Sequence, residues 1–473
     1  LLIHLTACWT DLPAEGMPPM VHKQMKQPRT AFILLSLRHI CWLSMLILTV
    51  QNVALTQDLP DAKKASSNTV VPQDNATLPN IELPALFSTG MILQRNAKCP
   101  IWGRSTDGKP VRILFRGQAV LAIPRNGRWK AEIESGTAGG PFPLRIESTE
   151  ALEFDAYVGE VWMLAGQSNA AHGRDYREVR GGPPVRFFSA TSKAADWYST
   201  GEIPLIAWNF GHGLREELDV PVGVISCAVG GTSIEQWRPV IDPDVTNAGP
   251  GGGCGPSREL YDKWLSPLIP YRIAGILWWQ GESNARNAES YGKKFASLIS
   301  EWRDVWMLGD IPFIWVQLQK VSPKGPGWLK TISNKRSVIA DMQRVPLNMP
   351  NTAMIATYDV TAGDLHPPEA EKKIISQRLV LAAMHLAYGR TSEYSGPLPE
   401  RAHMNGDSLT DEFSHSSKVL KTMKNPTIPA GTDGVDVIGF EIAEDANHYV
   451  QVKGTIRGKS VRIPILKSQR PLW

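Results

Sequence analysis

Cysteine is scarce in this chain: five occur among 473 residues, and none has the paired C-x-x-C spacing. The sequence therefore indicates neither a disulfide-rich scaffold nor a cysteine-based metal site. An excess of charge of one sign is also lacking, because 50 Lys and Arg against 46 Asp and Glu leave a net charge of +4. Such a balance gives no indication of a nucleic-acid partner. With 42% hydrophobic and 20% charged residues, we expect a soluble globular protein of two or three domains.

Long apolar runs are likewise missing, and the strongest is Ile40–Val50 (ICWLSMLILTV). A basic stretch, His22–Arg29, precedes it, and small residues follow near Ala54. This is the layout of a secretory signal peptide. The run is short for a membrane span, and Arg38 and His39 interrupt its upstream extension. We expect a secreted or periplasmic protein without stable membrane insertion after signal cleavage, and an uncleaved membrane anchor is the alternative.

Changes in composition divide the chain into five parts. We expect residues 1–56 to form an N-terminal extension with the signal peptide, and the polar residues 57–80 to form a linker. Residues 81–154 and 391–473 contain short β-like runs separated by turn signals, which in the first region are Asp107-Gly108, Asn126-Gly127 and Gly139-Gly140-Pro141. That spacing favours a β-sandwich for the first and a small β module for the second. The β-like runs are Met91–Leu93, Val111–Phe115, Val120–Ile123, Trp129–Ile133, Leu144–Ile146, Val435–Ile442, Tyr449–Val452 and Val461–Ile465.

Residues 155–390 alternate apolar strands with helical patterns. The expected strands are Val158–Leu164, Val222–Ala228, Ile273–Trp279, Pro312–Leu318 and Ala353–Tyr358. The expected helices lie around Trp208–Leu218, Ser290–Trp306, Leu329–Gln343 and Glu369–Tyr388. This alternation predicts an α/β fold, a doubly wound and mostly parallel sheet with helices on both faces. Ligands of such sheets bind at the loops that follow the carboxyl ends of the strands.

The first of these strands leads into the sequence VWMLAGQSNA, which carries Ser168. The apolar run breaks at Gly166 and presents Gln167, Ser168 and Asn169 in a tight turn. A serine at a strand's carboxyl end can expose its hydroxyl while backbone N–H groups point at the same space. The same residues also suit an ordinary turn, so the catalytic interpretation depends on a base and an oxyanion hole elsewhere in the chain.

Two further strand ends carry candidate groups for an oxyanion hole. The second strand ends at Gly230-Gly231, where the absence of side chains lets a backbone N–H approach a ligand closely. The third strand delivers Gln280, Glu282 and Asn284 within a few residues, which supplies amide donors and a carboxylate. Each loop alone is also compatible with an ordinary polar connection.

The last strand leads to Asp359 and then to Asp364-Leu365-His366-Pro367. A histidine that follows a carboxylate on a loop before a helix is suited to act as a base held in one tautomer by the acid. Because His366 ends the last strand of the sheet that also presents Ser168, we expect the two residues to act together.

Four blocks in this order resemble the sialate O-acetylesterase family, within the SGNH (GDSL-like) superfamily of serine hydrolases. The blocks are AGQSNA, VGGTSIEQW, LWWQGESNA and DLHPPEAEKKIISQRLVLAA. The resemblance extends over about Leu83 to Tyr388, with a fainter β-rich match to Ile463. It implies an SGNH-hydrolase-like (flavodoxin-like) doubly wound sheet, flanked by N-terminal and C-terminal β-sandwich-type modules.

The resemblance also implies roles for individual residues. Ser168 corresponds to the nucleophile and His366 to the general base. The Ser168 amide, Gly230 or Gly231, and a side-chain amide of Gln280 or Asn284 correspond to the oxyanion hole. Neither choice, between the two glycines or between the two amides, is decided by the sequence.

The acid departs from the family pattern. Many SGNH hydrolases have Asp three residues before the histidine, but Gly363 stands there and Asp364 is one step nearer. We favour Asp364 because of its proximity and place Glu282 second. Asp359 is a further candidate to orient His366, and a site that works as a Ser–His dyad would need no acid.

The predicted function is that of a secreted serine esterase that removes O-acetyl groups from sugars, with no metal or organic cofactor required. Trp237, Trp278 or Trp279 would stack on a sugar ring if exposed, and Arg238 would pair with an acidic sugar's carboxylate. Structural packing and a surface ion pair are equally compatible with these residues. The alternative function is a non-catalytic secreted carbohydrate-binding protein with a decayed hydrolase site. A lipase or peptidase is less favoured because no G-x-S-x-G motif surrounds Ser168.

Overall fold

The computed structural model describes residues 80–192, 196–242, 256–319, 321, 327–358, 360–361, 363–415, 436–443 and 449–464. The expected signal peptide and linker lie outside these ranges, apart from residue 80, and so does Asp359. Within the described ranges, no helix combines the length and apolar character that a membrane-spanning segment requires.

The N-terminal part consists of β-strands, which form sheets with one face buried. Its strands are β1 (Ile81–Glu82), β2 (Met91–Gln94), β3 (Lys98–Ser105), β4 (Val111–Phe115), β5 (Gln118–Ala122), β6 (Arg128–Glu134), β7 (Gly139–Glu147) and β8 (Ala151–Gly166). Strand β6 shows why these segments are strands: its residues alternate strictly between exposed and buried, as the two-residue period of a half-buried strand requires. Strands β1, β3 and β6 form one antiparallel sheet, and β4, β5 and β7 join a larger sheet through β8.

Short turns connect several of these strands. Asn126 and Gly127 both have positive φ, 52° and 72°, and they reverse the chain between β5 and β6 as expected from the Asn-Gly pair. The expected turn at Gly139-Gly140 differs, because these glycines already belong to β7. The register of β7 on β8 shifts between Gly139 and Phe142, so the glycines accommodate a bulge rather than a reversal.

Strand β8 runs through both parts of the fold. Its first half pairs with β7 and β2, and its second half pairs in parallel with β13 (Val222–Ala228) and β14 (Gly275–Trp279). The boundary expected at residues 154 and 155 therefore falls inside one continuous strand. In its second half every residue is buried, because both faces of a parallel sheet are covered.

The α/β part has a parallel sheet in the order β10-β13-β8-β14-β15-β16, extended at one edge by the antiparallel β11. From β8 the chain builds strands on one side and then returns to build the other side, so β8 lies at the point where the strand order reverses. Ligands of open α/β sheets bind at such a point. The remaining strands are β9 (Gly173–Tyr176), β10 (Val185–Ser189), β11 (Trp197–Tyr198), β12 (Gly201–Pro204), β15 (Phe313–Val316) and β16 (Thr352–Ile355).

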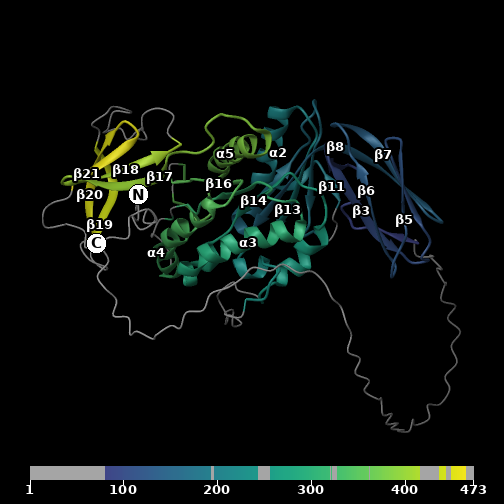
Figure 1. Cartoon of the computed structure of the whole chain (residues 1–473), viewed down its shortest axis with the longest axis horizontal. Coiled ribbons are helices and arrows are strands. Elements are labelled where there is room, and N and C mark those ends of the chain that lie inside the picture. Colours follow the sequence, from purple (N-terminus) through teal and green to yellow (C-terminus); the bar gives the residue numbers. More distant parts are fainter. Residues whose placement is uncertain are drawn as a thin grey trace, which may run out of the picture. The chain divides into compact units, whose positions relative to one another are not determined.

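Helices cover both faces of this sheet, with α2 and α5 on one side and α3 and α4 on the other (Figure 1). The α-helices are α1 (Ser168–Ala171), α2 (Leu205–Leu218), α3 (Tyr291–Trp306), α4 (Gly327–Met342) and α5 (Glu369–Tyr388). The short helices are η2 (Ile234–Trp237), η3 (Tyr261–Leu265), η4 (Ser266–Leu268), η5 (Glu282–Ser290) and η6 (Val345–Asn348). The core between the layers is rich in fully buried aromatic side chains, including Trp162, Trp278, Trp302 and Trp315.

The C-terminal part contains a five-stranded antiparallel sheet in the order β17-β18-β21-β20-β19. Its strands are β17 (Leu398–Asn405), β18 (Ser408–Ser414), β19 (Asp436–Ala443), β20 (Tyr449–Arg457) and β21 (Ser460–Pro464).

Candidate active site

The turn after β8 presents Ser168 as the first residue of α1. Gly166 makes this turn possible: its φ is +137°, and a Cβ at this position would lie 2.1 Å from the carbonyl oxygen of Trp279. The backbone N–H of Gln167 donates to that same carbonyl at 2.9 Å, which fixes the turn against the end of β14. Among the hydrogen bonds of the described residues none uses the backbone N–H of Ser168, as expected for the first N–H groups of a helix. A backbone N–H in this position is suited to stabilise an oxyanion.

His366 reaches Ser168 from the loop that precedes α5. Its Nε2 lies 3.0 Å from Ser168 Oγ, although the two residues are 198 positions apart in the sequence. His366 is exposed to solvent. Partial burial lowers the pKa of His366, and the nearby cations Lys372 and Arg336 lower it further, while the Glu282 carboxylate opposes them. A neutral imidazole within hydrogen-bond distance of a hydroxyl can accept its proton.

The candidate acids occupy different environments. Asp364 is exposed, and among the hydrogen bonds of the described residues none joins it to His366. Glu282 is buried, with 8% of its surface exposed. Its Oε1 accepts a hydrogen bond of 2.8 Å from Asn169 Nδ2 and lies 3.8 Å from Arg336 Nη2. The structure thus brings Glu282 into the site through Asn169 and leaves the Asp364 carboxylate in solvent.

The two glycines after β13 differ in their surroundings. A Cβ at Gly230 would lie 3.6 Å from the Cβ of Ser168, so Gly230 lies directly beside Ser168. Gly231 has a φ of +74°, and a Cβ there would have no heavy atom within 4 Å. Gly230 is therefore the glycine that lies close enough to share a space with Ser168, while Gly231 provides the left-handed turn that brings it there.

The amides of Gln280 and Asn284 are used inside the loops themselves. Gln280 Nε2 donates to the carbonyl of Thr232 at 2.9 Å and to Asn284 Oδ1 at 2.8 Å, so both of its N–H groups have acceptors. Asn284 Nδ2 donates to both carboxylate oxygens of Glu235, at 3.1 and 2.9 Å. Both side chains are buried and join the loop after β13 to the loop after β14. Their hydrogen bonds hold the glycine loop in place and leave these amides without a donor directed at Ser168.

The residues expected to bind the sugar belong to the core instead. Trp237, Trp278 and Trp279 have at most 1% of their surface exposed, so no sugar ring can stack on them in this structure. Arg238 donates to both oxygens of Glu301 and also lies 3.4 Å from Asp242. The hydrogen bond with Glu301 raises the pKa of Arg238. Its charge is thus already paired with two carboxylates of the protein.

Three residues near the reacting pair were not selected from the sequence. Asn169, next to Ser168, donates through Nδ2 to Glu282 and, at 3.2 Å, to the carbonyl of Leu365. Lys372 is buried and donates to the carbonyl of Asn169 at 3.0 Å. His172 contacts the ring of His366. Position relative to Ser168 was a usable signal for Asn169 and His172, whereas Lys372 and Lys373 look alike in the sequence.

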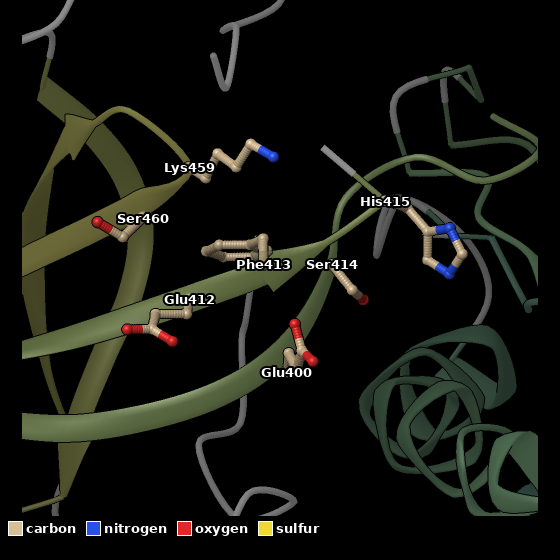
Figure 2. A pocket seen from close by; sticks show the side chains of 7 residues that line it. All are labelled: Glu400, Glu412, Phe413, Ser414, His415, Lys459 and Ser460. Carbon is tan, nitrogen blue, oxygen red and sulfur yellow. The ribbon is translucent and has the colours of Figure 1, made fainter. Parts of the chain in front are cut away.

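A concave site with a volume of about 460 Å³ lies on the C-terminal sheet (Figure 2). It is lined by Glu400, Glu412, Phe413, Ser414, His415, Lys459 and Ser460. Glu412 is paired with Arg401, and His415 with Glu393. Among the described residues no serine of this site pairs with a histidine as Ser168 does with His366.

Comparisons with known proteins agree on one kind of chemistry. Residues 158–385 match the family model described as carbohydrate esterase, sialic acid-specific acetylesterase. The chain is 28% identical over 389 residues to the sialate O-acetylesterase of Homo sapiens, covering 67% of this chain and 73% of that protein. With the sialate O-acetylesterase of Mus musculus it shares 26% identity over 429 residues, covering 71% and 79%.

A solved structure resembles most of the chain as well. The crystal structure of a carbohydrate acetylesterase from Xanthomonas citri matches with a TM-score of 0.68 and 26% sequence identity. The match covers 83% of this chain and 93% of that one.

Proposed function

Because the chain belongs to the carbohydrate esterase family of sialic acid-specific acetylesterases, and is a carboxylic ester hydrolase, we propose that it removes O-acetyl groups from sugars through an acetyl-serine intermediate. The observation that carries the mechanism is the 3.0 Å separation between His366 Nε2 and Ser168 Oγ. O-acetylated sialic acids are the first substrate class to test, and acetylated plant glycans are the second.

The reaction proceeds in two halves. Ser168 Oγ attacks the acetyl carbonyl carbon while His366 Nε2 takes the hydroxyl proton. The C–O bond to the sugar then breaks, and His366 returns the proton to the departing sugar oxygen. Water attacks the acetyl-serine with His366 again as the base, which releases acetate and restores the Ser168 hydroxyl.

The developing negative charge needs donors beside Ser168. The amide of Ser168 and the backbone N–H of Gly230 are the donors that the geometry favours, because Gly230 lies next to the nucleophile. Gln280 and Asn284 support the oxyanion hole indirectly in this proposal, by holding the glycine loop. Losing one such donor costs about a hundredfold or more in turnover.

We assign the carboxylate role to Glu282 rather than Asp364. The support is electrostatic: Glu282 is buried and favours the charged form of His366, whereas Asp364 is exposed and makes no hydrogen bond to His366 among those the described residues form. In this proposal Glu282 acts from a distance to stabilise the imidazolium that forms on His366 during the reaction. Of Ser168, His366 and Glu282, the first two contact the reacting atoms.

The proposal includes an SGNH-type fold and secretion. The strand order around β8 and the arrangement of the four sequence blocks at one sheet edge support the fold. The basic stretch followed by the apolar run at residues 40–50 supports secretion. Expression in a secreting cell, followed by N-terminal sequencing of the protein in the medium, tests the second point, and retention of the apolar run in a membrane fraction contradicts it.

Acetate release measured over a panel of O-acetylated sialic acids and acetylated xylan fragments tests the function. We expect the purified protein to release acetate, and Ser168→Ala to lose about three orders of magnitude or more. A fluorophosphonate should label the wild-type serine and not the variant. A protein that binds acetylated sugars, releases no acetate and resists the label would be a carbohydrate-binding protein instead.

A further inference from the structure

Lys372 is a buried cation that the proposed reaction does not use. It lies near the start of α5, six residues after His366, and 1% of its surface is exposed. Its Nζ donates to the carbonyl of Asn169 at 3.0 Å and lies 5.7 Å from the centre of the Trp279 ring. Among the described residues no carboxylate lies within ion-pair distance of it. Burying an ammonium without a paired carboxylate is costly, which points to a specific role.

Asn169 connects the two halves of the reacting pair. It follows Ser168 directly, and its Nδ2 donates to the carbonyl of Leu365, the residue before His366, at 3.2 Å. The same Nδ2 donates to Glu282 Oε1 at 2.8 Å. Asn169 is fully buried, so these bonds are shielded from water. One side chain thus joins the turn of the nucleophile, the loop of the base and the buried carboxylate.

We propose that Lys372 and Asn169 are positioning residues of the esterase, which hold the loop of His366 against the turn of Ser168 and place a cation beside the base. Lys372 fixes the backbone of the turn through the Asn169 carbonyl, and Asn169 fixes the histidine loop through the Leu365 carbonyl. The inference rests on the proposed esterase reaction and extends it to residues that touch neither the substrate nor the reacting atoms.

The cation also has an electrostatic consequence that can be measured. Among the residues that the structure describes, the charged and titratable groups around His366 are Glu282 from η5, Arg336 from α4, Lys372 from α5, His172 after α1, and Asp364 on its own loop. Lys372 lowers the pKa of His366, because its positive charge disfavours the imidazolium. Replacing Lys372 by an uncharged residue therefore raises that pKa, and activity should begin at a higher pH.

The test compares Lys372→Met with Lys372→Arg, and uses Lys373→Met as the matched control. Lys373 is the next residue of the same helix and is exposed. For each purified variant, kcat and KM for p-nitrophenyl acetate are measured as a function of pH, together with the thermal unfolding temperature. The wild type and Ser168→Ala are measured first, since a wild type without Ser168-dependent hydrolysis overturns the proposed function and not the positioning role.

We expect Lys372→Met to lose about tenfold to a hundredfold in kcat with little change in KM. The acidic limb of its kcat/KM profile should move upward by roughly half a pH unit or more. Lys372→Arg should keep the wild-type limb, and Lys373→Met should match the wild type throughout. Methionine removes a buried charge but also leaves the carbonyl of Asn169 without this donor, so the unfolding temperature serves to show that the variant is folded at the assay temperature, and the kinetics decide the role.

A folded Lys372→Met protein with wild-type kcat and an unshifted acidic limb overturns the proposal. If that variant does not fold, Asn169→Ala decides, because it removes the bond to Leu365 but leaves the backbone carbonyl that Lys372 binds. A fall of about tenfold or more in kcat at unchanged KM supports the positioning role. Wild-type kcat in Asn169→Ala overturns it.

Discussion

The imidazole of His172 contacts the imidazole of His366 edge to face, with ring centroids 4.2 Å apart and an interplanar angle of 61°. His172 is the C-cap residue of α1, so the residue that follows the helix of Ser168 also packs against His366. Burial and the neighbouring imidazole lower the pKa of His172, which keeps it neutral at pH 7. The contact is therefore one of packing between two neutral rings.

Replacing His172 by alanine should loosen the ring of His366. Aromatic contacts of this kind contribute about 0.5–1.5 kcal/mol, so we expect kcat/KM to fall about two- to tenfold. His172→Phe retains an aromatic edge and should recover most of the loss. Steady-state kinetics with an aryl acetate measures both variants, and equal losses in the alanine and phenylalanine variants would show that the imidazole nitrogens of His172 matter instead.

The two candidate acids predict different outcomes on neutralisation. Glu282→Gln removes a buried negative charge that favours the protonated form of His366, so the pKa of His366 should fall and the acidic limb of kcat/KM should move to lower pH. The variant also leaves Arg336 and Lys372 without that compensation, and a stability loss of about 3 kcal/mol is expected. Asp364→Asn, at an exposed position, should change kcat less than about threefold. A larger loss of kcat in Asp364→Asn than in Glu282→Gln would return the acid role to Asp364.

The wild-type enzyme should stay active below the ordinary titration range of histidine. The pKa of His366 lies below its usual value of 6.5, because of partial burial and the cations Lys372 and Arg336. His366 acts as a base only when neutral, so the acidic limb of kcat/KM should have its midpoint below pH 6.5. Because His366 has a lower pKa in the folded protein than in the unfolded chain, the unfolded chain binds a proton at this residue more readily. The free energy of unfolding therefore decreases as the pH falls below 6.5. A midpoint above 6.5 in the kinetic profile would contradict the assignment of His366 as the base in this environment.

The two glycines beside the nucleophile should respond differently to a methyl group. At Gly230 the new Cβ would make an ordinary contact of 3.6 Å with Ser168 Cβ, so Gly230→Ala should fold normally. It crowds the space where the acetyl group approaches, and we expect a loss of about tenfold or more in kcat/KM. Gly231→Ala should instead cost about 1–2 kcal/mol of stability, because a φ of +74° disfavours any side chain. Unfolding temperatures measured beside the kinetics separate the two effects, and equal destabilisation would contradict the assignment.

Much of the secondary structure could be predicted because prolines and glycines mark the ends of segments that have a regular pattern of apolar residues. Strand β13 occupies Val222–Ala228 as expected, since a run that is apolar except for Ser226 follows Pro221. Helix α5 occupies Glu369–Tyr388 as expected, between Pro367-Pro368 and a left-handed Gly389. Strand β10 was not predicted, because its five residues, VRFFS, are too short to show a clear period.

The sequence predicted where the candidate site residues lie in the fold, but not which way their side chains point. Strand ends brought Ser168, Gly230 and His366 to one sheet edge, where a periodic pattern can place residues. Gln280 is also at this edge, but its amide turns to the carbonyl of Thr232. The acceptor to which an amide donates depends on residues that are distant in the sequence, and a local sequence pattern does not specify these. For the same reason the sequence left open whether Trp237 stacks on a sugar or packs in the core, and the structure has it buried.

Strand β8 links Ser168, the proposed nucleophile, to the N-terminal β-strands. Residues 151–158 of this strand are held by β7 and β2, and eight residues after Val158 the strand ends at the nucleophile turn. A shortened chain that starts at residue 155 would lose β7 and β2, which pair with the first part of its central strand. Grafting the esterase domain onto another protein therefore requires the preceding β-strands as well, since the segment that leads to Ser168 and the segment that pairs with β7 and β2 are one continuous strand.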